Sequence, residues 1–338
     1  MTDYDQLVLI LRRATGIANE MAKELARLYY DIWKTIDLTD DFQANKKRIL
    51  KVYSEYDMKS SLNAKLLPIA TASIAGAVAV IPELTTIPTT KKMVNDSMAI
   101  IMPESNISTN DLIARTKGVS QSQVVNYTKQ AIDEGWTSRE LRKALSVSES
   151  STKKHVDTIA RTSVNAVSNN SRMQLYKAND DMIDRVIYSA TLDSRTSNHC
   201  SVLDGKVFYL EDAPVIPGHP NCRSSYVMLL KGEDAQEVID DLLPRPAVVP
   251  KNEEQYEKQG LTTSTGKTRK PSKTDRSPLK GTQSNSESYE SWLRKMPEYY
   301  QEDIIGVEAT KEFNKGASLK SVINVSPITE KELNKAIN

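Results

Sequence analysis

The residues best suited to chemistry gather in one short segment of this chain. Both cysteines, Cys200 and Cys222, and two of the three histidines, His199 and His219, lie between positions 199 and 222. Thiolates and imidazoles together can hold a tetrahedral zinc ion. The same residues could instead form a disulfide, pack as two small buried thiols, or supply a nucleophile with its base.

The spacing of these residues favours a structural role. His199 and Cys200 are adjacent, which is a poor geometry for two ligands on one metal, whereas His219 and Cys222 are well spaced as a pair. No Gly-rich nucleophile elbow, P-loop or dinucleotide fingerprint accompanies them. We therefore predict two packed thiols, no cofactor, no catalytic residue and no enzymatic activity. Zinc at Cys200, Cys222 and His219, a disulfide between the cysteines, and a metal-dependent enzyme stay open as alternatives.

Charged residues flank this cluster on its N-terminal side. We expect Asp193 and Arg195 to organise the loop through charge-assisted hydrogen bonds, so that Arg195→Ala would loosen the region from 150 to 230. Asp204 and Gly205 lie in a Leu-Asp-Gly-Lys sequence that is typical of a turn, with Gly205 at positive φ ahead of a strand.

A preceding helix presents an unusual polar face. Arg161, Asn165, Asn169, Arg172 and Tyr176 follow one another at steps of 4, 4, 3 and 4, which places them on one side of a helix. A solvated face usually carries Lys and Glu, whereas Asn and Arg form hydrogen bonds with defined geometry. The pattern favours a polar seam that holds the loops and sheet in place, with a solvated face as the alternative.

The elements that would position these residues indicate an α+β fold, mostly helical in its first half. Apolar residues at 3- and 4-residue steps predict a helix over 3–36. Further helices are expected over 40–62 and 149–178. Prolines should limit residues 83–107 to short or broken helices. Two short helical units are expected between 108 and 134, with Ser120 capping the second, and a further helical turn should begin at 137. β-branched runs predict strands over 185–191, 206–210 and 224–230.

This pattern divides the chain into four regions. We predict a helical region over 1–148, an α+β module over 149–232, a linker with a basic arm over 233–287 and short helices over 288–338. Ser288 is expected to cap the first of these short helices, and Pro297 and Gly306 to bound the second. Residues 66–82 carry no charge, and their length and dilution by Pro and Gly favour a buried helix over a membrane segment.

The overall charge restricts the classes of partner. With 45 basic and 44 acidic residues, global attraction to nucleic acid is excluded, and any contact must be local. Two cysteines suit a reducing compartment, and the acidic N-terminus does not resemble a signal peptide. The arm carries six basic residues that could contact DNA phosphates, or else form a solvated linker: Lys267, Arg269, Lys270, Lys273, Arg276 and Lys280.

The order of these motifs resembles the Mu F-like family of phage head-morphogenesis (minor capsid) proteins. The resemblance covers about residues 150–230, and a C-terminal segment from 288 to 306 resembles one that is common in the family. Many members carry further cysteines at the positions of Ser197 and Ser224. The matching residues, which the resemblance makes structural, are Arg161, Asn165, Arg172, Tyr176, Asp193, Arg195, Thr196, Cys200, Asp204, Gly205, His219, Pro220, Cys222 and Arg223.

The resemblance also implies a function. It predicts a minor head protein that acts in procapsid assembly, located inside the virion capsid near the portal vertex and assembled in the host cytoplasm. Its expected partners are the portal protein, coat or scaffolding protein, and packaged double-stranded DNA, with no membrane partner. The alternative is a DNA-binding internal protein that is ejected with the genome.

Overall fold

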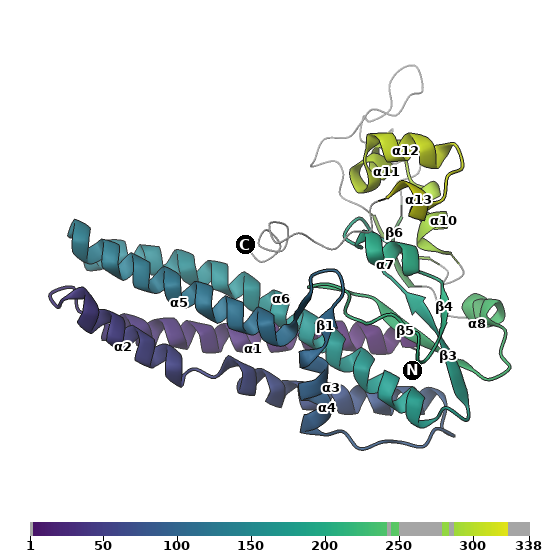
Figure 1. Ribbon diagram of the computed structural model, residues 1–338, viewed down its shortest axis with the longest axis horizontal. Coiled ribbons are helices and arrows are strands. Elements are labelled where there is room, and N and C mark those ends of the chain that lie inside the picture. Colours follow the sequence, from purple (N-terminus) through teal and green to yellow (C-terminus); the bar gives the residue numbers. More distant parts are fainter. Residues whose placement is uncertain (1–2, 242–244, 250–278, 284–286, 324–338) are drawn as a thin grey trace.

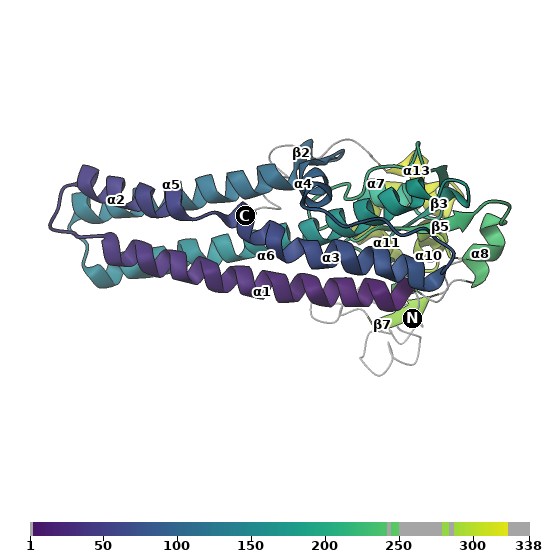
Figure 2. The same ribbon diagram turned by 90° about the horizontal axis from the view of Figure 1, so that it is seen from below.

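A long helical stalk projects from a smaller module of helix and sheet (Figure 1). The computed structural model describes residues 3–241, 245–249, 279–283 and 287–323, and its α+β fold confirms the predicted class. Within these ranges, the stalk is formed by four helices, which are α1 (Asp3–Thr35), α2 (Phe42–Glu55), α5 (Thr109–Glu134) and α6 (Ser138–Ala178). Seen from below, α1 and α6 run from the tip of the stalk into the module (Figure 2).

Helix α1 confirms the predicted apolar stripe. Ile17, Met21, Leu25, Leu28 and Ile32 recur at steps of three or four residues, and all are buried in the main core. Because these steps place the side chains on one side of a helix, α1 buries that side against α6 and leaves the other side polar.

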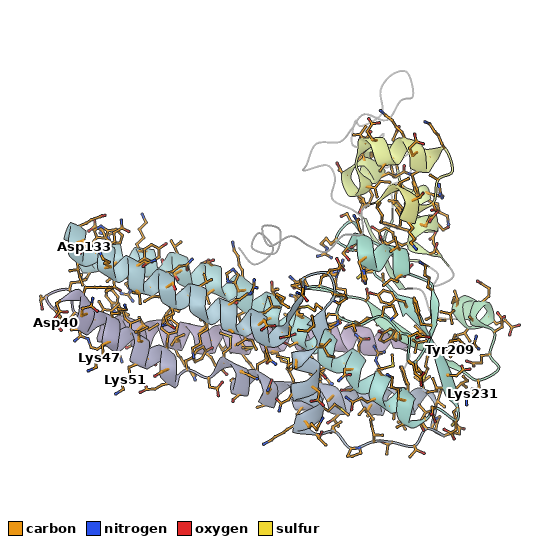
Figure 3. All side chains as sticks on the ribbon, viewed as in Figure 1. Asp40, Lys47, Lys51, Asp133, Tyr209 and Lys231 are labelled. Carbon is orange, nitrogen blue, oxygen red and sulfur yellow. The ribbon has the colours of Figure 1, made fainter. Side chains whose placement is uncertain are left out.

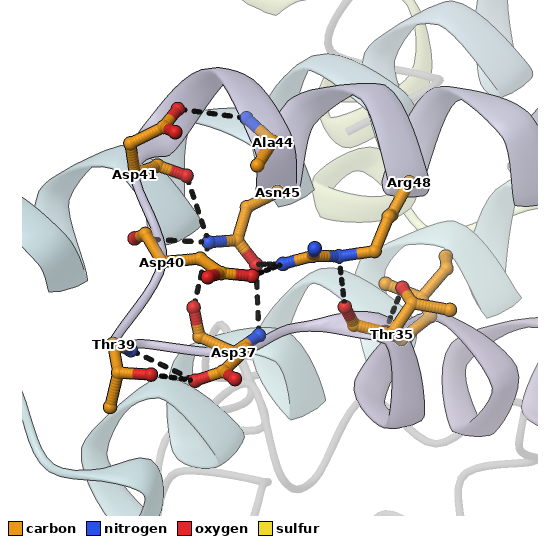
Figure 4. A network of polar contacts seen from close by, with 9 residues as sticks. Thr35, Asp37, Thr39, Asp40, Asp41, Ala44, Asn45 and Arg48 are labelled. Carbon is orange, nitrogen blue, oxygen red and sulfur yellow. Dashed lines mark hydrogen bonds and ion pairs between the residues drawn. The ribbon is translucent and has the colours of Figure 1, made fainter.

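A polar network closes the tip of the stalk, where α1 turns into α2 (Figure 4). The buried side chain of Asn45 accepts a hydrogen bond from the Asp37 N–H at 2.9 Å and donates to the Asp37 carbonyl at 2.7 Å. Arg48 donates to the Thr35 carbonyl at 2.7 Å and pairs with Asp40 at 2.8 Å. These bonds satisfy backbone groups that a helix end leaves open, so they hold the turn in one conformation.

Buried hydroxyl groups join the helices of the stalk. Tyr29 Oη on α1 lies 2.8 Å from Ser120 Oγ on α5 and 2.7 Å from Ser148 Oγ on α6. Tyr53 Oη on α2 lies 2.7 Å from the same Ser120 hydroxyl. Because each buried hydroxyl has a partner, the network stabilises one arrangement of the four helices.

Two helix boundaries differ from the prediction. Helix α5 is continuous from a capping box of Ser108 and Asp111 to Gly135, so Ser120 does not begin a second helix. Helix α6 is likewise one helix of 41 residues, where two units were expected. Ser120 and Ser148 belong to the buried hydroxyl network, and sequence spacing alone does not separate a serine that caps a helix from one that bonds within a bundle.

The uncharged segment forms helix α3 (Met58–Val80), which begins before the predicted end of the preceding helix. One side is buried, and there Ser73 Oγ donates to Ser168 Oγ on α6 at 2.9 Å, while Pro68 lies on the exposed side. In the described ranges, the stretch Phe42–Val80, which spans α2 and α3, alone has the length and composition to cross a membrane, and 39% of its apolar window is buried. The segment is thus a helix whose inner side packs within the bundle.

A hairpin between α4 (Lys91–Ala99) and the stalk helix α5 contacts the module. Helix α4 leads into β1 (Ile101–Met102), which pairs antiparallel with β2 (Ile107–Ser108). At its turn, the Glu104 N–H donates to the carbonyl of Gly218 in the module at 3.0 Å. A short helix followed by a hairpin confirms that prolines break the helices in this range.

The module is built on a three-stranded antiparallel sheet with the order β4-β3-β5. Strands β4 (Val207–Tyr209) and β5 (Ser225–Leu230) lie within their predicted ranges, and β3 (Ile183–Ser189) begins two residues before its own. Helix α7 (Asn198–Leu203) connects β3 to β4, and the second half of α6 packs against β3 and β5. The loops that carry the cysteines and histidines therefore lie between this sheet and α6.

The C-terminal helices form a second core against the module (Figure 1). Trp292, Leu293 and Phe313 are buried there together with Leu192, which lies in the loop after β3. Ser288 caps the first helix and Gly306 follows the second, as predicted. The helices are α10 (Tyr289–Arg294), α11 (Glu298–Ile305), α12 (Val307–Asn314) and α13 (Leu319–Val322).

Parts of the predicted linker form regular structure instead. After α8 (Ala235–Asp241), strand β6 (Arg245–Val249) pairs antiparallel with β7 (Leu279–Gln283). Lys280 stands opposite Val248 in this pair, so it belongs to a strand rather than to an arm. The other basic residues of the predicted arm lie outside the described residues: Lys267, Arg269, Lys270, Lys273 and Arg276.

Candidate functional site

Asp193, in the loop after β3, is the centre of a charge network. The Arg223 guanidinium donates to both of its carboxylate oxygens, at 2.6 Å each. Arg195 adds a guanidinium contact at 3.1 Å, and its backbone N–H donates at 2.9 Å. Burial alone would raise the pKa of Asp193, but the hydrogen bonds from Arg223 outweigh it and hold the pKa below its usual value. The main partner of Asp193 is therefore Arg223, and Arg195 comes second.

Asp204, just after α7, connects the module to the C-terminal helices. One carboxylate oxygen accepts from the Ala190 N–H and the other from the Tyr289 N–H, both at 2.7 Å. Tyr289 also donates its hydroxyl to the Asp193 carbonyl at 2.9 Å. Gly205 has a φ of 75°, which confirms the predicted turn. Tyr289 was expected only as part of a helix, because nothing in its spacing points to the module.

The polar face of α6 reaches the backbone at the start of β5. Asn165 donates to the Ser224 carbonyl at 3.0 Å, and the Tyr226 N–H donates to the side-chain oxygen of Asn169 at 3.3 Å. Arg172 donates to that same oxygen at 3.0 Å and to the Tyr226 carbonyl at 3.4 Å. These residues form a polar seam between α6 and the edge strand β5.

Other residues of the predicted motif lie apart from this seam. Arg161 pairs with Asp157 on its own helix at 2.8 Å, and both side chains are partly exposed. Tyr176 is buried in the main core. The Thr196 hydroxyl donates to the Thr191 carbonyl and so closes the loop that carries Asp193.

The loop of His219, Pro220, Asn221, Cys222 and Arg223 is anchored to α6 through a residue that the sequence did not single out. The Asn221 N–H donates to Thr162 Oγ1 at 2.9 Å, and its side chain donates to Thr158 Oγ1 at 3.1 Å. Its φ of 62° is of the kind that Asn tolerates better than most residues. This anchor places His219 and Cys222 beside α7.

Cys200 on α7 meets His219 and Cys222 in a buried cluster, hereafter the Cys/His cluster. The two sulfur atoms lie 3.8 Å apart, and the ligand atoms of all three residues lie within 4.8 Å of one another. Both thiols are free, so they do not form the disulfide that the sequence left open. The Tyr188 hydroxyl donates to Cys200 Sγ at 3.2 Å. The cluster thus brings together the three residues named as candidate metal ligands.

Hydrogen bonding within the Cys/His cluster makes the two thiols unequal. The bond between them lowers the pKa of Cys222 to about 7 against the effect of burial. The same bond, together with burial, raises the pKa of Cys200. Burial would lower the pKa of His219, but its contacts with Cys200 and Glu104 raise it to about 9. Cys222 is therefore the sulfur that more readily carries negative charge.

Glu104, which the sequence did not single out, reaches this cluster from the hairpin between α4 and α5. It is 7% exposed, and its Oε1 lies 3.9 Å from His219 Nε2. Ser197 donates to the same oxygen at 2.8 Å. A side chain at Gly218 would place its Cβ 3.2 Å from this oxygen, so the Glu104 carboxylate would have to shift by a few tenths of an ångström. Glu104 was missed because it is an acid in a loop, 93 positions before Ser197, and no local pattern marks it.

A cavity of about 520 Å³ borders the loop that carries His219 and Cys222. Three arginines line it, but each already pairs with a carboxylate: Arg161 with Asp157, and Arg195 and Arg223 with Asp193. The cavity therefore offers solvent a path to the loop, and two carboxylates balance two of its three arginines, since Arg195 and Arg223 share Asp193.

One comparison with known proteins matches this part of the chain. Residues 122–227 match the family model described as phage Mu protein F like protein. The matched range begins within α5 and includes all of the Cys/His cluster, together with Asp193, Asp204 and Arg223. No curated protein and no solved structure matches the chain. Residues 122–227 therefore belong to the phage Mu F-like family, the family that the order of the motifs predicts.

Proposed function

We propose that this protein is a non-enzymatic minor head protein that binds the portal protein of its phage during procapsid assembly. The family match indicates a phage head-morphogenesis protein and a place in the capsid of the virion. A position inside the capsid near the portal vertex, and assembly in the host cytoplasm, belong to the proposal. The observation that carries it is the separation of a rigid helical stalk from the module (Figure 1).

The polar groups of the module support a structural role. The carboxylates of Asp193 and Asp204 are occupied by arginines and by backbone N–H groups within the fold. Cys200 and Cys222 are 1% and 2% exposed. A nucleophile or a general base has to come within hydrogen-bond distance of its substrate, and these groups would have to leave their native contacts to do so.

The stalk offers a surface for the portal protein. Tyr30 on α1 is 54% exposed. It lines a hollow together with Trp33 and Arg142, whose guanidinium carbon is 5.7 Å from the centre of the Trp33 ring. Trp, Tyr and Arg are the residues that most often dominate binding energy at protein interfaces. We assign the portal contact to this stalk face, defined by Tyr30, Trp33 and Arg142.

Co-purification of the full chain with the portal protein of the same phage tests this assignment. Tyr30→Asp should reduce recovery of the portal protein at least about tenfold, a loss of about 1.4 kcal/mol. Tyr209 on β4 is the matched control, since it is 62% exposed but lies on the module, far from the tip marked by Asp40 and Asp133 (Figure 3). If Tyr30→Asp binds like the parent, or if Tyr209→Asp alone loses binding, the stalk face is not the contact.

Contact with packaged DNA is a secondary function, supported by the basic residues between 267 and 276. The test changes Lys267, Arg269, Lys270, Lys273 and Arg276 to Gln and leaves Lys280, which lies in β7. The variant should bind double-stranded DNA more weakly, with a shallower dependence of log affinity on log salt concentration. Portal binding should not change. Unaltered DNA affinity would exclude this role, and lost portal binding would assign the segment to assembly instead.

A further inference from the structure

The geometry of the Cys/His cluster points to a site that the sequence did not favour. We propose that Cys200, Cys222, His219 and Glu104 form a tetrahedral zinc site that ties the hairpin of the stalk to the module. The sequence favoured packed thiols because it offered three plausible ligands and a fourth, His199, in a poor position. The structure supplies a different fourth ligand from a distant segment.

The distance between the sulfur atoms suits zinc. Two thiolates at the usual zinc–sulfur distance of about 2.3 Å and at a tetrahedral angle lie about 3.8 Å apart. Cys200 Sγ and Cys222 Sγ are 3.8 Å apart. A zinc ion can therefore bind between them with the two sulfur atoms left where they are, and both thiols release their protons to solvent as it binds.

The imidazole of His219 is oriented as a metal ligand. Its Nδ1 lies 2.8 Å from the Pro220 carbonyl, and a carbonyl can only accept, so Nδ1 carries the proton when the ring is neutral. The lone pair is then on Nε2, the atom nearest Glu104. Histidines that bind metals usually donate their other N–H to a carbonyl or a carboxylate in this way.

Glu104 is a buried carboxylate whose one ion-pair partner in the described residues is the imidazole of His219. No Lys or Arg in the described part of the chain pairs with it, and its one ion-pair contact there is with His219 at 3.9 Å. Nitrogen and oxygen ligands of a tetrahedral zinc ion lie about 3.4 Å apart, so Glu104 is already within about half an ångström of that distance from His219. Its side chain still has to turn toward the two sulfur atoms, since among the described residues the group within 4.8 Å consists of Cys200, His219 and Cys222. A buried carboxylate is costly without a compensating charge, and a divalent cation provides one. The hydrogen bond from Ser197 orients it.

The site explains why two parts of the chain meet at this point. The Glu104 N–H also bonds to the Gly218 carbonyl, next to His219, so backbone and side chain both bring the hairpin to the cluster. Zinc would turn this contact into a bond between the stalk and the module.

Zinc analysis of the full chain, purified without chelator from zinc-supplemented cells, tests the site. We expect one zinc per chain, and absorption bands of tetrahedral thiolate coordination after cobalt substitution. Both measurements use the folded parent protein and need no variant. A folded parent protein with no bound zinc and no cobalt–thiolate bands would overturn the proposal.

Variants then identify the ligands. Cys222→Ser and His219→Gln should lose the metal, and Glu104→Gln should weaken zinc binding at least about tenfold. Glu24→Gln is the matched control, since Glu24 is a partly buried carboxylate that pairs with Lys65 at 3.1 Å, away from the site. If Glu104→Gln binds zinc like Glu24→Gln, or if His199→Gln is the weakened variant, Glu104 is not the fourth ligand.

Discussion

Replacing Arg223 should destabilise the module far more than replacing Arg195, although both guanidinium groups pair with Asp193. The Arg223 side chain is 23% exposed and donates twice, at 2.6 Å, to a carboxylate that is 8% exposed. The Arg195 side chain is 78% exposed. Loss of one partner from a buried pair costs about 3–5 kcal/mol, whereas an exposed pair contributes about 0–1 kcal/mol. We expect a cost of about 3 kcal/mol for Arg223→Ala and below about 1 kcal/mol for Arg195→Ala.

Urea unfolding followed by tryptophan fluorescence measures this difference. Trp33 and Trp136 lie in the stalk, so changing both to Phe leaves Trp292, in the core beside the module, as the reporter. With a urea dependence of about 1–3 kcal/mol per molar, a cost of 3 kcal/mol lowers the midpoint by about 1 M or more. Far-UV circular dichroism, dominated by the long stalk helices, reports on the rest of the molecule in the same samples.

Arg161→Ala is the control, because Arg161 pairs with Asp157 on the surface of α6, where the two side chains are 40% and 47% exposed. Its midpoint should move no more than that of Arg195→Ala. The reasoning is refuted if Arg195→Ala shifts the midpoint as far as Arg223→Ala does. It is also refuted if Arg223→Ala cannot be told from Arg161→Ala. The expectation that Arg195 organises the loop would stand in the first case.

Three further outcomes follow from single contacts. The pKa of Asp193 in the folded protein lies below its unfolded value of about 3.8. Its pairing therefore stabilises the protein above that pH, and this stabilisation is lost as the pH falls through the folded pKa. The urea midpoint of the parent should drop below about pH 4, and Asp193→Asn should make that drop smaller. In thermal melts, Tyr29→Phe should lower the free energy of unfolding by about 1–3 kcal/mol, since it leaves buried hydroxyls with one partner fewer. Tyr30→Phe, on the exposed side of the same helix, should change it very little, and equal losses for the two variants would contradict the hydroxyl network. Gly205→Ala should lower the free energy of unfolding by about 1 kcal/mol, because φ at this position is 75°. Gly118→Ala, inside α5 with open space around it, should raise it by about 0.5–1 kcal/mol. Destabilisation by both variants would count against this account of Gly205.

Local signals were enough to predict most of the elements. The apolar steps in α1, the β-branched runs of β3 to β5 and the caps at Ser288 and Gly306 each depend on residues within a few positions of one another. The predicted breaks within α5 and α6 were wrong for the opposite reason. Whether Ser120 caps a helix or bonds within the bundle depends on Tyr29, which lies far away in the sequence.

The partners of the motif residues were beyond local reasoning. Asp193 was identified correctly as a centre of hydrogen bonding, but its position in the sequence does not reveal that its main partner is Arg223 and not Arg195. Tyr289 bonds to Asp204 across 85 positions, and Ser197 to Glu104 across 93. No periodicity relates residues at such separations, and one sequence without relatives carries no other sign of contact.

These long-range contacts converge on the two ends of α7. At its N-terminal end, Ser197 meets Glu104 from the stalk hairpin, and at its C-terminal end, Asp204 meets Tyr289 from the C-terminal helices. Between them, Cys200 faces Cys222 from the loop before β5. A six-residue helix held by three separate parts of the chain has little freedom to open around a substrate. The reactive residue types are concentrated here because they connect α7 to these other segments of the chain. Thiols, imidazole and carboxylates can hold distant segments together at a place where the apolar core is too small to do so.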